Sequence, residues 1–191
     1  MTSTSLDSLP QEALFQLALQ ALRGDDPAAA VACLEEAASR GDASGPTCYL
    51  LGAQYAQMGR FDDAAREFER AVAIDPALSI ARFQYGLLAL TMGDAAQSTQ
   101  ILAPLLQLGQ TDPLAHFAAG LLHLVRDEFA EALACLEHGI ARNASNPPLN
   151  ADMQKLMGRI RSTMAASVEP ENAPNKGESH ILLSAYTGNG L

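Results

Sequence analysis

The sequence predicts an all-α fold, a solenoid of stacked helical hairpins. Short segments with hydrophobic residues at helical spacing alternate with turns rich in Gly, Asp and Pro. A composition with 48% hydrophobic residues, 5% aromatic residues and no Trp suits close-packed helices better than a sheet. The third observation is a repeat of 34 residues, which places a small residue in one column: Ala18, Gly52, Gly86 and Gly120.

Two further columns keep the same spacing. A second small residue recurs at Ala30, Ala64, Ser98 and Ala132, and a large one recurs at Leu34, Phe68, Leu102 and Leu136. A small residue lets a second helix approach closely. The three columns in phase predict four hairpins, at residues 11–44, 45–78, 79–112 and 113–146.

Residues 1–10 form the N-terminal lead-in, of which residues 1–8 are polar and expected to be loose. The helices of the first hairpin are predicted at about residues 10–23 and 27–40, because Gly24-Asp25-Asp26 separates two periodic segments. Pro27 then occupies a first helical position, where its missing N–H costs nothing.

The second hairpin, residues 45–78, shows the pattern most clearly. Its first helix ends at Gly59, acidic residues open the second, and Asp75-Pro76 ends it. The order of its residues resembles the tetratricopeptide repeat, with Cys48 in place of the usual leading Trp. The residues that carry the resemblance are Leu51, Gly52, Tyr55, Ala64, Phe68, Ala71 and Pro76. The resemblance covers residues 11 to about 166 and implies a right-handed superhelix whose first helices line a concave groove.

The third and fourth hairpins depart from the pattern in places. Pro104 lies within the second helix of the third hairpin, expected from Ala95 to about Leu108, and predicts a bend there. In the fourth hairpin, Asp127 stands where a turn glycine is common and Gly139 where alanine is common.

Residues 149–166 predict a capping helix with one apolar side and a polar outer face. The apolar side is formed by Met153, Leu156, Met157, Ile160 and Met164, and the polar face by Gln154, Lys155, Arg159 and Arg161. Residues 167–179 are rich in Pro, Glu, Asn and Gly and predict a flexible linker. Residues 180–191, HILLSAYTGNGL, form an apolar C-terminal tail.

The charge and hydropathy of the chain exclude several classes of partner. A net charge of −10, from 22 acidic and 12 basic residues, opposes binding to nucleic acid or anionic lipid. No apolar segment approaches the length that a membrane span needs. The N-terminus lacks the basic region before an apolar run that is typical of a signal peptide. Cys33 and Cys135 lie three repeats apart, so they are interpreted as buried hydrophobic residues in a reducing compartment. We therefore expect a soluble, cytoplasmic protein.

The sequence offers little for catalysis. It has no phosphate loop, nucleophile elbow or paired-cysteine metal motif, so we expect no enzymatic activity, no cofactor and no metal. His116 and His123 lie seven residues apart on one predicted helix, about 10 Å along its axis, which is too far to share a metal. His138 lies near Cys135 but without a carboxylate at matching spacing.

The resemblance implies a partner-binding groove lined by the first helices. The positions that it places there are Phe15, Leu19, Leu22, Tyr49, Ala53, Ala56, Phe83, Leu87, Leu90, Phe117, Leu121 and Leu124. An aromatic residue opens each of the four sets, and none of the twelve is Lys, Arg or Asn, so clamping of a terminal carboxylate is not predicted. Half-exposed, the four aromatic side chains would present about 300 to 500 Å² of apolar surface. The competing interpretation is that these side chains only pack between adjacent helices.

The function expected from these patterns is a non-catalytic scaffold or chaperone-like adaptor that binds an apolar segment of a partner protein. The alternative is a self-assembling or autoregulated module. In that case the tail would dock in the groove of its own or a neighbouring chain through Ile181, Leu182, Leu183 and Tyr186. Extended, the 13 linker residues span at most about 43 to 47 Å, which lets the tail return to the groove.

Overall fold

The computed structural model describes residues 6–166, and all regular secondary structure in that range is helical. The all-α fold class is therefore confirmed. The elements in chain order are η1 (Leu6–Ser8), α1 (Gln11–Arg23), α2 (Pro27–Ser39), α3 (Gly45–Gln57), α4 (Phe61–Ile74), α5 (Ser79–Thr91), α6 (Ala95–Leu102), η2 (Ala103–Leu108), α7 (Pro113–Val125), α8 (Phe129–Arg142) and α9 (Pro147–Ala166), where η marks a 3-10 helix.

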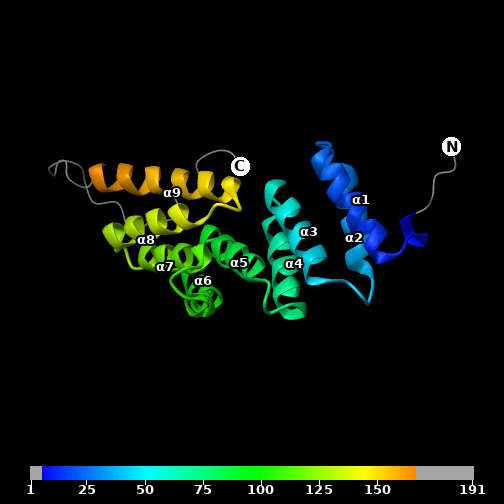
Figure 1. The fold of residues 1–191 in the computed structure, drawn as a ribbon, viewed down its shortest axis with the longest axis horizontal. Coiled ribbons are helices and arrows are strands. Elements are labelled where there is room, and N and C mark those ends of the chain that lie inside the picture. The colour runs from blue at the N-terminus through cyan, green and yellow to red at the C-terminus, as the bar shows by residue number, and fades with distance from the viewer. Residues whose placement is uncertain (1–5, 167–191) are drawn as a thin grey trace. The chain divides into compact units, whose positions relative to one another are not determined.

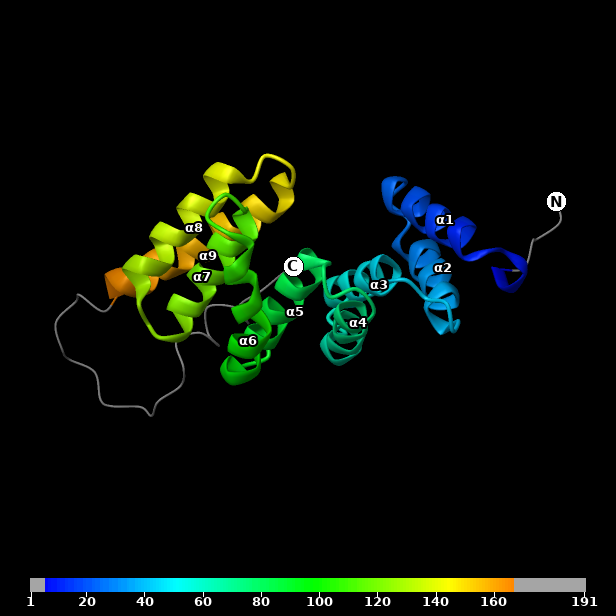
Figure 2. The ribbon, with the colours of Figure 1, turned by 60° about the horizontal axis from the view of Figure 1, so that its bottom comes forward.

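The chain divides into two compact units, Met1–Tyr85 and Gly86–Leu191. In the first unit, α1 packs on α2 and α3 packs on α4, and α2 also contacts α3. In the second unit, α7 packs on α8, α9 covers α8, and α6 and η2 contact α7. Figures 1 and 2 show α3 beside α4 and α7 beside α8 from two directions, as expected for helical hairpins.

The columns of small and large residues meet inside each hairpin. A Cβ added at Gly52 would lie 2.8 Å from the Phe68 ring, and one at Gly120 would lie 2.9 Å from Leu136. In the third hairpin, Gly86 faces Leu102 in the same way, at 2.5 Å. Close contacts between the two helices of a hairpin therefore recur every 34 residues.

Each hairpin turn contains one residue in the left-handed backbone region, and these residues are also 34 positions apart. They are Asp25 with φ 56°, Gly59 with φ 73°, Gly93 with φ 85° and Asp127 with φ 57°. Aspartate tolerates this region better than most residues with a side chain, because it can hydrogen-bond locally. The turn geometry is thus kept where the turn glycine is missing.

The third hairpin differs from the expected long second helix. Helix α6 ends at Leu102, and Ala103–Leu108 continues as the 3-10 helix η2. Pro104 lies in the first turn of η2, where it lacks the N–H that an α-helix would use. The residue Ser98, in a small-residue column, donates a hydrogen bond of 2.8 Å to the Gly86 carbonyl, so its buried hydroxyl is satisfied.

Helix α9 begins at Pro147, slightly before the expected capping helix, and packs on α8. Asn143 fixes the turn between them. Its side-chain amide donates to the Asn146 carbonyl at 2.9 Å and to Asn150 Oδ1 at 2.8 Å, and Asn150 donates back to the Asn143 carbonyl. Because Asn143 is buried, these bonds replace its contacts with water.

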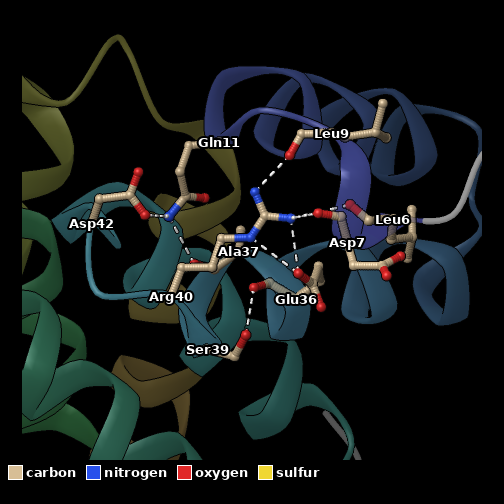
Figure 3. A network of polar contacts seen from close by, with 9 residues as sticks. All are labelled: Leu6, Asp7, Leu9, Gln11, Glu36, Ala37, Ser39, Arg40 and Asp42. Carbon is tan, nitrogen blue, oxygen red and sulfur yellow. Dashed lines mark hydrogen bonds and ion pairs between the residues drawn. The ribbon is translucent and has the colours of Figure 1, made fainter.

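The end of the lead-in is held in place, contrary to the expected loose segment, through contacts made by Arg40 (Figure 3). Its guanidinium donates to the carbonyls of Leu9 at 2.5 Å, Leu6 at 3.1 Å and Asp7 at 3.1 Å, and it pairs with Glu36 at 2.8 Å. The planar fork of arginine can serve several acceptors at once, which explains why one side chain orders η1. Residues 1–5 of the lead-in lie outside the described range.

Replacing Arg40 by alanine is expected to release η1. The variant loses charge-assisted hydrogen bonds to three carbonyls, so the free energy of unfolding should fall by about 1 to 3 kcal/mol. The Leu9 amide, bonded to the Leu6 carbonyl at 3.1 Å, should exchange with deuterium at least tenfold faster. Arg66→Ala is the control, because Arg66 is exposed and pairs only at the surface. Equal amide exchange in both variants would show that Arg40 does not hold the lead-in.

Candidate protein-binding surface

Helix α1 presents a row of partly exposed apolar side chains. Leu14 and Ala18 are buried, while Phe15, Leu19 and Leu22 are half-buried. The last three lie four and three residues apart, which places them along one side of the helix. Hence α1 contributes to the hairpin core and still leaves an apolar strip partly open to solvent.

Helix α3 carries the next set, Tyr49, Ala53 and Ala56, and all three are half-buried. The Tyr49 ring lies 6.1 Å from the Phe68 ring at an interplanar angle of 35°. It also packs against a small buried cluster of Cys48, Ala71 and Ala81. Burial raises the pKa of the Tyr49 phenol. One side of Tyr49 is therefore anchored to its own hairpin.

The six remaining groove candidates are buried. Phe83, Leu87, Leu90, Phe117, Leu121 and Leu124 expose at most 7% of their surface. The expectation that four half-exposed aromatic rings form one apolar patch is therefore wrong for Phe83 and Phe117, which have no exposed surface. A role of these six residues in binding stays a prediction, and it requires that their exposed area increase.

Gly139 lies directly against the buried ring of Phe117. A Cβ at Gly139 would overlap atoms of the Phe117 ring, so the ring occupies the space left by the missing side chain. The equivalent positions in the first two hairpins hold Ala37 and Ala71. The sequence contained this signal, because Gly139 departs from the repeat pattern.

The proposed tail residues, Ile181, Leu182, Leu183 and Tyr186, lie outside the described residues. The tail hypothesis therefore remains a prediction from the sequence.

A polar cluster that sequence patterns did not indicate joins helices α2 and α3 of the first unit to Arg60, which precedes α4. Tyr55 on α3 donates a hydrogen bond of 2.7 Å to Glu35 on α2. The Arg60 guanidinium lies 4.0 Å from the centroid of the Tyr55 ring and 3.9 Å from Glu35. Burial, followed by the hydrogen bond to Glu35, raises the pKa of Tyr55 to about 12. Tyr55 and Arg60 lie 20 or more residues from Glu35, so no local pattern predicts the pairing.

Sequence spacing groups His116 with His123, but the structure gives each of them a different partner. His123 Nδ1 lies 2.5 Å from Glu128, which also accepts from Arg126. The hydrogen bond from His123, then the one from Arg126, lowers the pKa of Glu128. His116 instead lies beside His138, with ring centroids 5.8 Å apart. Within residues 6–166, no group of three or more metal-ligating side chains is placed to hold a metal ion.

The three cysteines are free thiols. Cys33 and Cys48 are buried and Cys135 is half-buried. Burial raises the pKa of all three thiols, and that of Cys48 to about 11. A raised pKa lowers the thiolate fraction at neutral pH, so these thiols lack the character of a nucleophile.

Known proteins with similar sequence or structure support the helical-repeat pattern of this chain. Residues 46–78 match the family model of the tetratricopeptide repeat. The chain has the tetratricopeptide-repeat fold. Within the described residues the structure shows helical hairpins with the repeat's close contacts, followed by the packed helix α9. A search of curated proteins finds no match.

Several solved structures share this fold at low sequence identity. TTC0263, a thermophilic tetratricopeptide-repeat protein of Thermus thermophilus, is 16% identical with a TM-score of 0.63, over 81% of this chain and 83% of that one. MamA from Desulfovibrio magneticus RS-1, from residue 41 to its end, is 15% identical with a TM-score of 0.60, over 81% and 85%. YrrB, a repeat protein with an unusual peptide-binding site, is 20% identical with a TM-score of 0.58, over 76% and 74%. At these identities the likeness concerns the fold.

Among the described residues, no helix has the length and apolar character needed to cross a membrane.

Proposed function

We propose that this chain is a non-catalytic scaffold or chaperone-like adaptor that binds an apolar segment of a partner protein. The proposed contact surface is the half-buried row on the first helices of the first unit, formed by Phe15, Leu19, Leu22, Tyr49 and Ala53. A cytoplasmic location is part of the proposal, because three free thiols suit a reducing compartment.

The observation that carries the proposal is the incomplete burial of this row. Its neighbours Leu14, Ala18 and Leu51 are buried in the hairpins, so the row is not needed to close the core. It contains no charged side chain, and therefore suits an apolar rather than an ionic partner surface. The peptide-binding site named for YrrB supports the proposal, because that protein has the same fold.

The chain offers a matched pair of variants for the test. Leu19 lies in the row, whereas Leu17 is 39% exposed on the same helix and outside the row. A panel of labelled, uncharged apolar peptides is titrated against the wild-type chain and against Leu19→Glu and Leu17→Glu. We expect Leu19→Glu to weaken binding at least tenfold, because it brings a carboxylate into an apolar contact, and Leu17→Glu to leave it unchanged.

Two results would contradict the proposal. One is equal loss of binding in both variants, which would place the peptide elsewhere or report non-specific adhesion. The other is the absence of saturable binding by any peptide of the panel. Circular dichroism of both variants excludes unfolding as the cause.

The alternative, an autoregulated module, is tested in the same experiment with a chain that ends at residue 179. Residues 180–191 contain no acidic or basic residue other than His180 and include an apolar run, which suits the same uncharged row. A tethered segment reaches a millimolar effective concentration, so its deletion should strengthen peptide binding. If the deletion leaves the affinity for the peptide unchanged, the tail does not compete for the row. The autoregulated module is then refuted, and the partner-binding function still stands.

A further inference from the structure

Gln54 on α3 carries an amide that has no hydrogen-bond partner among the described residues. The residue is only 6% exposed. Within residues 6–166, the unpaired side-chain atoms that solvent cannot reach are Gln11 Oε1 and Glu67 Oε2. The amide of Gln54 is not among them, so its oxygen and its nitrogen still touch solvent through a narrow opening. Most buried amides are paired, and an unpaired one calls for an explanation.

The fold does not require an amide at this position. The equivalent positions in the third and fourth hairpins hold Leu88 and Leu122, which are 6% and 7% exposed. Leucine is therefore buried to the same degree at this place in two other hairpins. An amide brings two N–H donors and a carbonyl acceptor, and leaving them unpaired destabilises the folded chain. A polar group placed at a cost to stability is typical of a site that binds a ligand.

The side chain of Gln54 points toward α1. On the same helix, Gly52 lies against α4 and Tyr55 bonds to α2. Tyr49 packs against a cluster that includes Ala81, near the start of α5. An α-helix turns by about 100° per residue, so Gln54 lies about 200° from Gly52 and at least about 100° from both tyrosines. Among the helices of the first unit, this leaves α1 to cover Gln54.

The apolar row on α1 faces the same opening. Phe15 occupies the column of Tyr49, which turns toward the first helix of the next hairpin. By the same geometry Phe15, with Leu19 and Leu22 beside it, turns toward α3. Gln54 and the row therefore line one opening between α1 and α3, in which apolar side chains lie beside an unpaired amide.

We propose that Gln54 binds the main chain of the partner segment, and that this segment lies extended between α1 and α3. The inference rests on the proposed function and specifies the conformation of the partner. A residue of an extended chain presents its N–H and C=O side by side on one edge, as in a β-ladder. The glutamine amide offers the complementary acceptor and donor, so one residue of the segment satisfies both. An α-helix uses these main-chain groups internally, so a helical segment would leave Gln54 unpaired.

Peptides in which single backbone amides are replaced by esters test this contact, because an ester lacks the N–H donor and adds no bulk. The probe is the tightest-binding uncharged peptide of the panel used for the row, with an ester at each position in turn. It is titrated against the wild-type chain and Gln54→Leu. The variant should bind the all-amide peptide about fivefold to tenfold more weakly, since two hydrogen bonds are lost. One ester should weaken wild-type binding by a similar factor and cause little further loss in Gln54→Leu.

The stability of Gln54→Leu separates a binding role from a structural one. Leucine removes the unpaired amide and fills the position as Leu88 and Leu122 do, so the melting temperature should stay the same or rise. Gln20→Leu is the matched control, because Gln20 occupies the same column in the first hairpin but is exposed. This control should change neither the peptide affinity nor the melting temperature.

The outcomes distinguish this inference from the proposed function. If Gln54→Leu binds the all-amide peptide as tightly as the wild-type chain while Leu19→Glu still weakens binding, the main-chain contact is refuted and the function stands. The contact is also refuted if every ester causes equal loss in both chains, or if Gln54→Leu melts at a lower temperature, since the amide would then support the fold. If no peptide of the panel binds, both proposals fail.

Discussion

Gly52→Leu is expected to lower the free energy of unfolding by about 3 kcal/mol or more. A Cβ at this position would lie 2.8 and 2.9 Å from atoms of the Phe68 ring and 3.2 Å from the Ala64 carbonyl oxygen. Phe68 is itself buried and cannot move aside without disturbing the α3–α4 contact. Overpacking typically costs 1 to 3 kcal/mol for smaller insertions, and leucine adds four carbon atoms here. For a chain of this size we expect the melting temperature to fall by about 6 to 12 °C.

Gly158→Leu provides the matched control for this prediction. Gly158 also lies within a helix, α9, but a Cβ there meets no atom within 4 Å. Leucine has the higher helix propensity, so this variant should melt at the wild-type temperature or slightly above it. If the two variants melted alike, the close approach of α3 and α4 at Gly52 would not exist and the repeat register would be wrong.

Phe117→Ala is expected to cost about 3 to 5 kcal/mol, the usual loss when a buried phenylalanine is removed. Phe117 is fully buried, and its ring fills the space above Gly139. Tyr49→Ala should cost less, because Tyr49 occupies the equivalent position but is only half-buried. Chemical denaturation of both variants measures the difference.

A double-mutant cycle shows whether the Phe117 ring and Gly139 act as a pair. Gly139→Ala alone should destabilise the protein, because its methyl group would overlap the ring. In the Phe117→Ala background the same change should be nearly neutral or favourable, since the space is then empty. Strictly additive losses would refute the contact. If Phe117→Ala left the melting temperature unchanged, Phe117 would not be a buried core residue.

Local sequence patterns were enough to predict the repeat and the ends of most helices. These depend on short-range properties, namely the spacing of small and large residues and the turn residues Gly59 and Gly93. Asp25 and Asp127 show the same locality, since each takes the left-handed conformation that its turn requires. Such features are encoded within one hairpin, where the partners are close in sequence and the helical period fixes which side they share.

The depth to which each groove candidate is buried depends on tertiary contacts. Helical spacing put Phe15, Tyr49 and Phe117 in one column, but Phe117 is fully buried against Gly139 of a different helix, whereas Phe15 and Tyr49 are half-buried. The pairings of Tyr55 with Glu35 and of His116 with His138 likewise join residues 20 or more positions apart. Leu106, which is 43% exposed, lies in η2 beyond the end of α6, where Pro104 cannot support an α-helix. A periodic pattern specifies the side of a helix on which a residue lies, and the neighbouring element, with its own volume and geometry, specifies whether that side is covered.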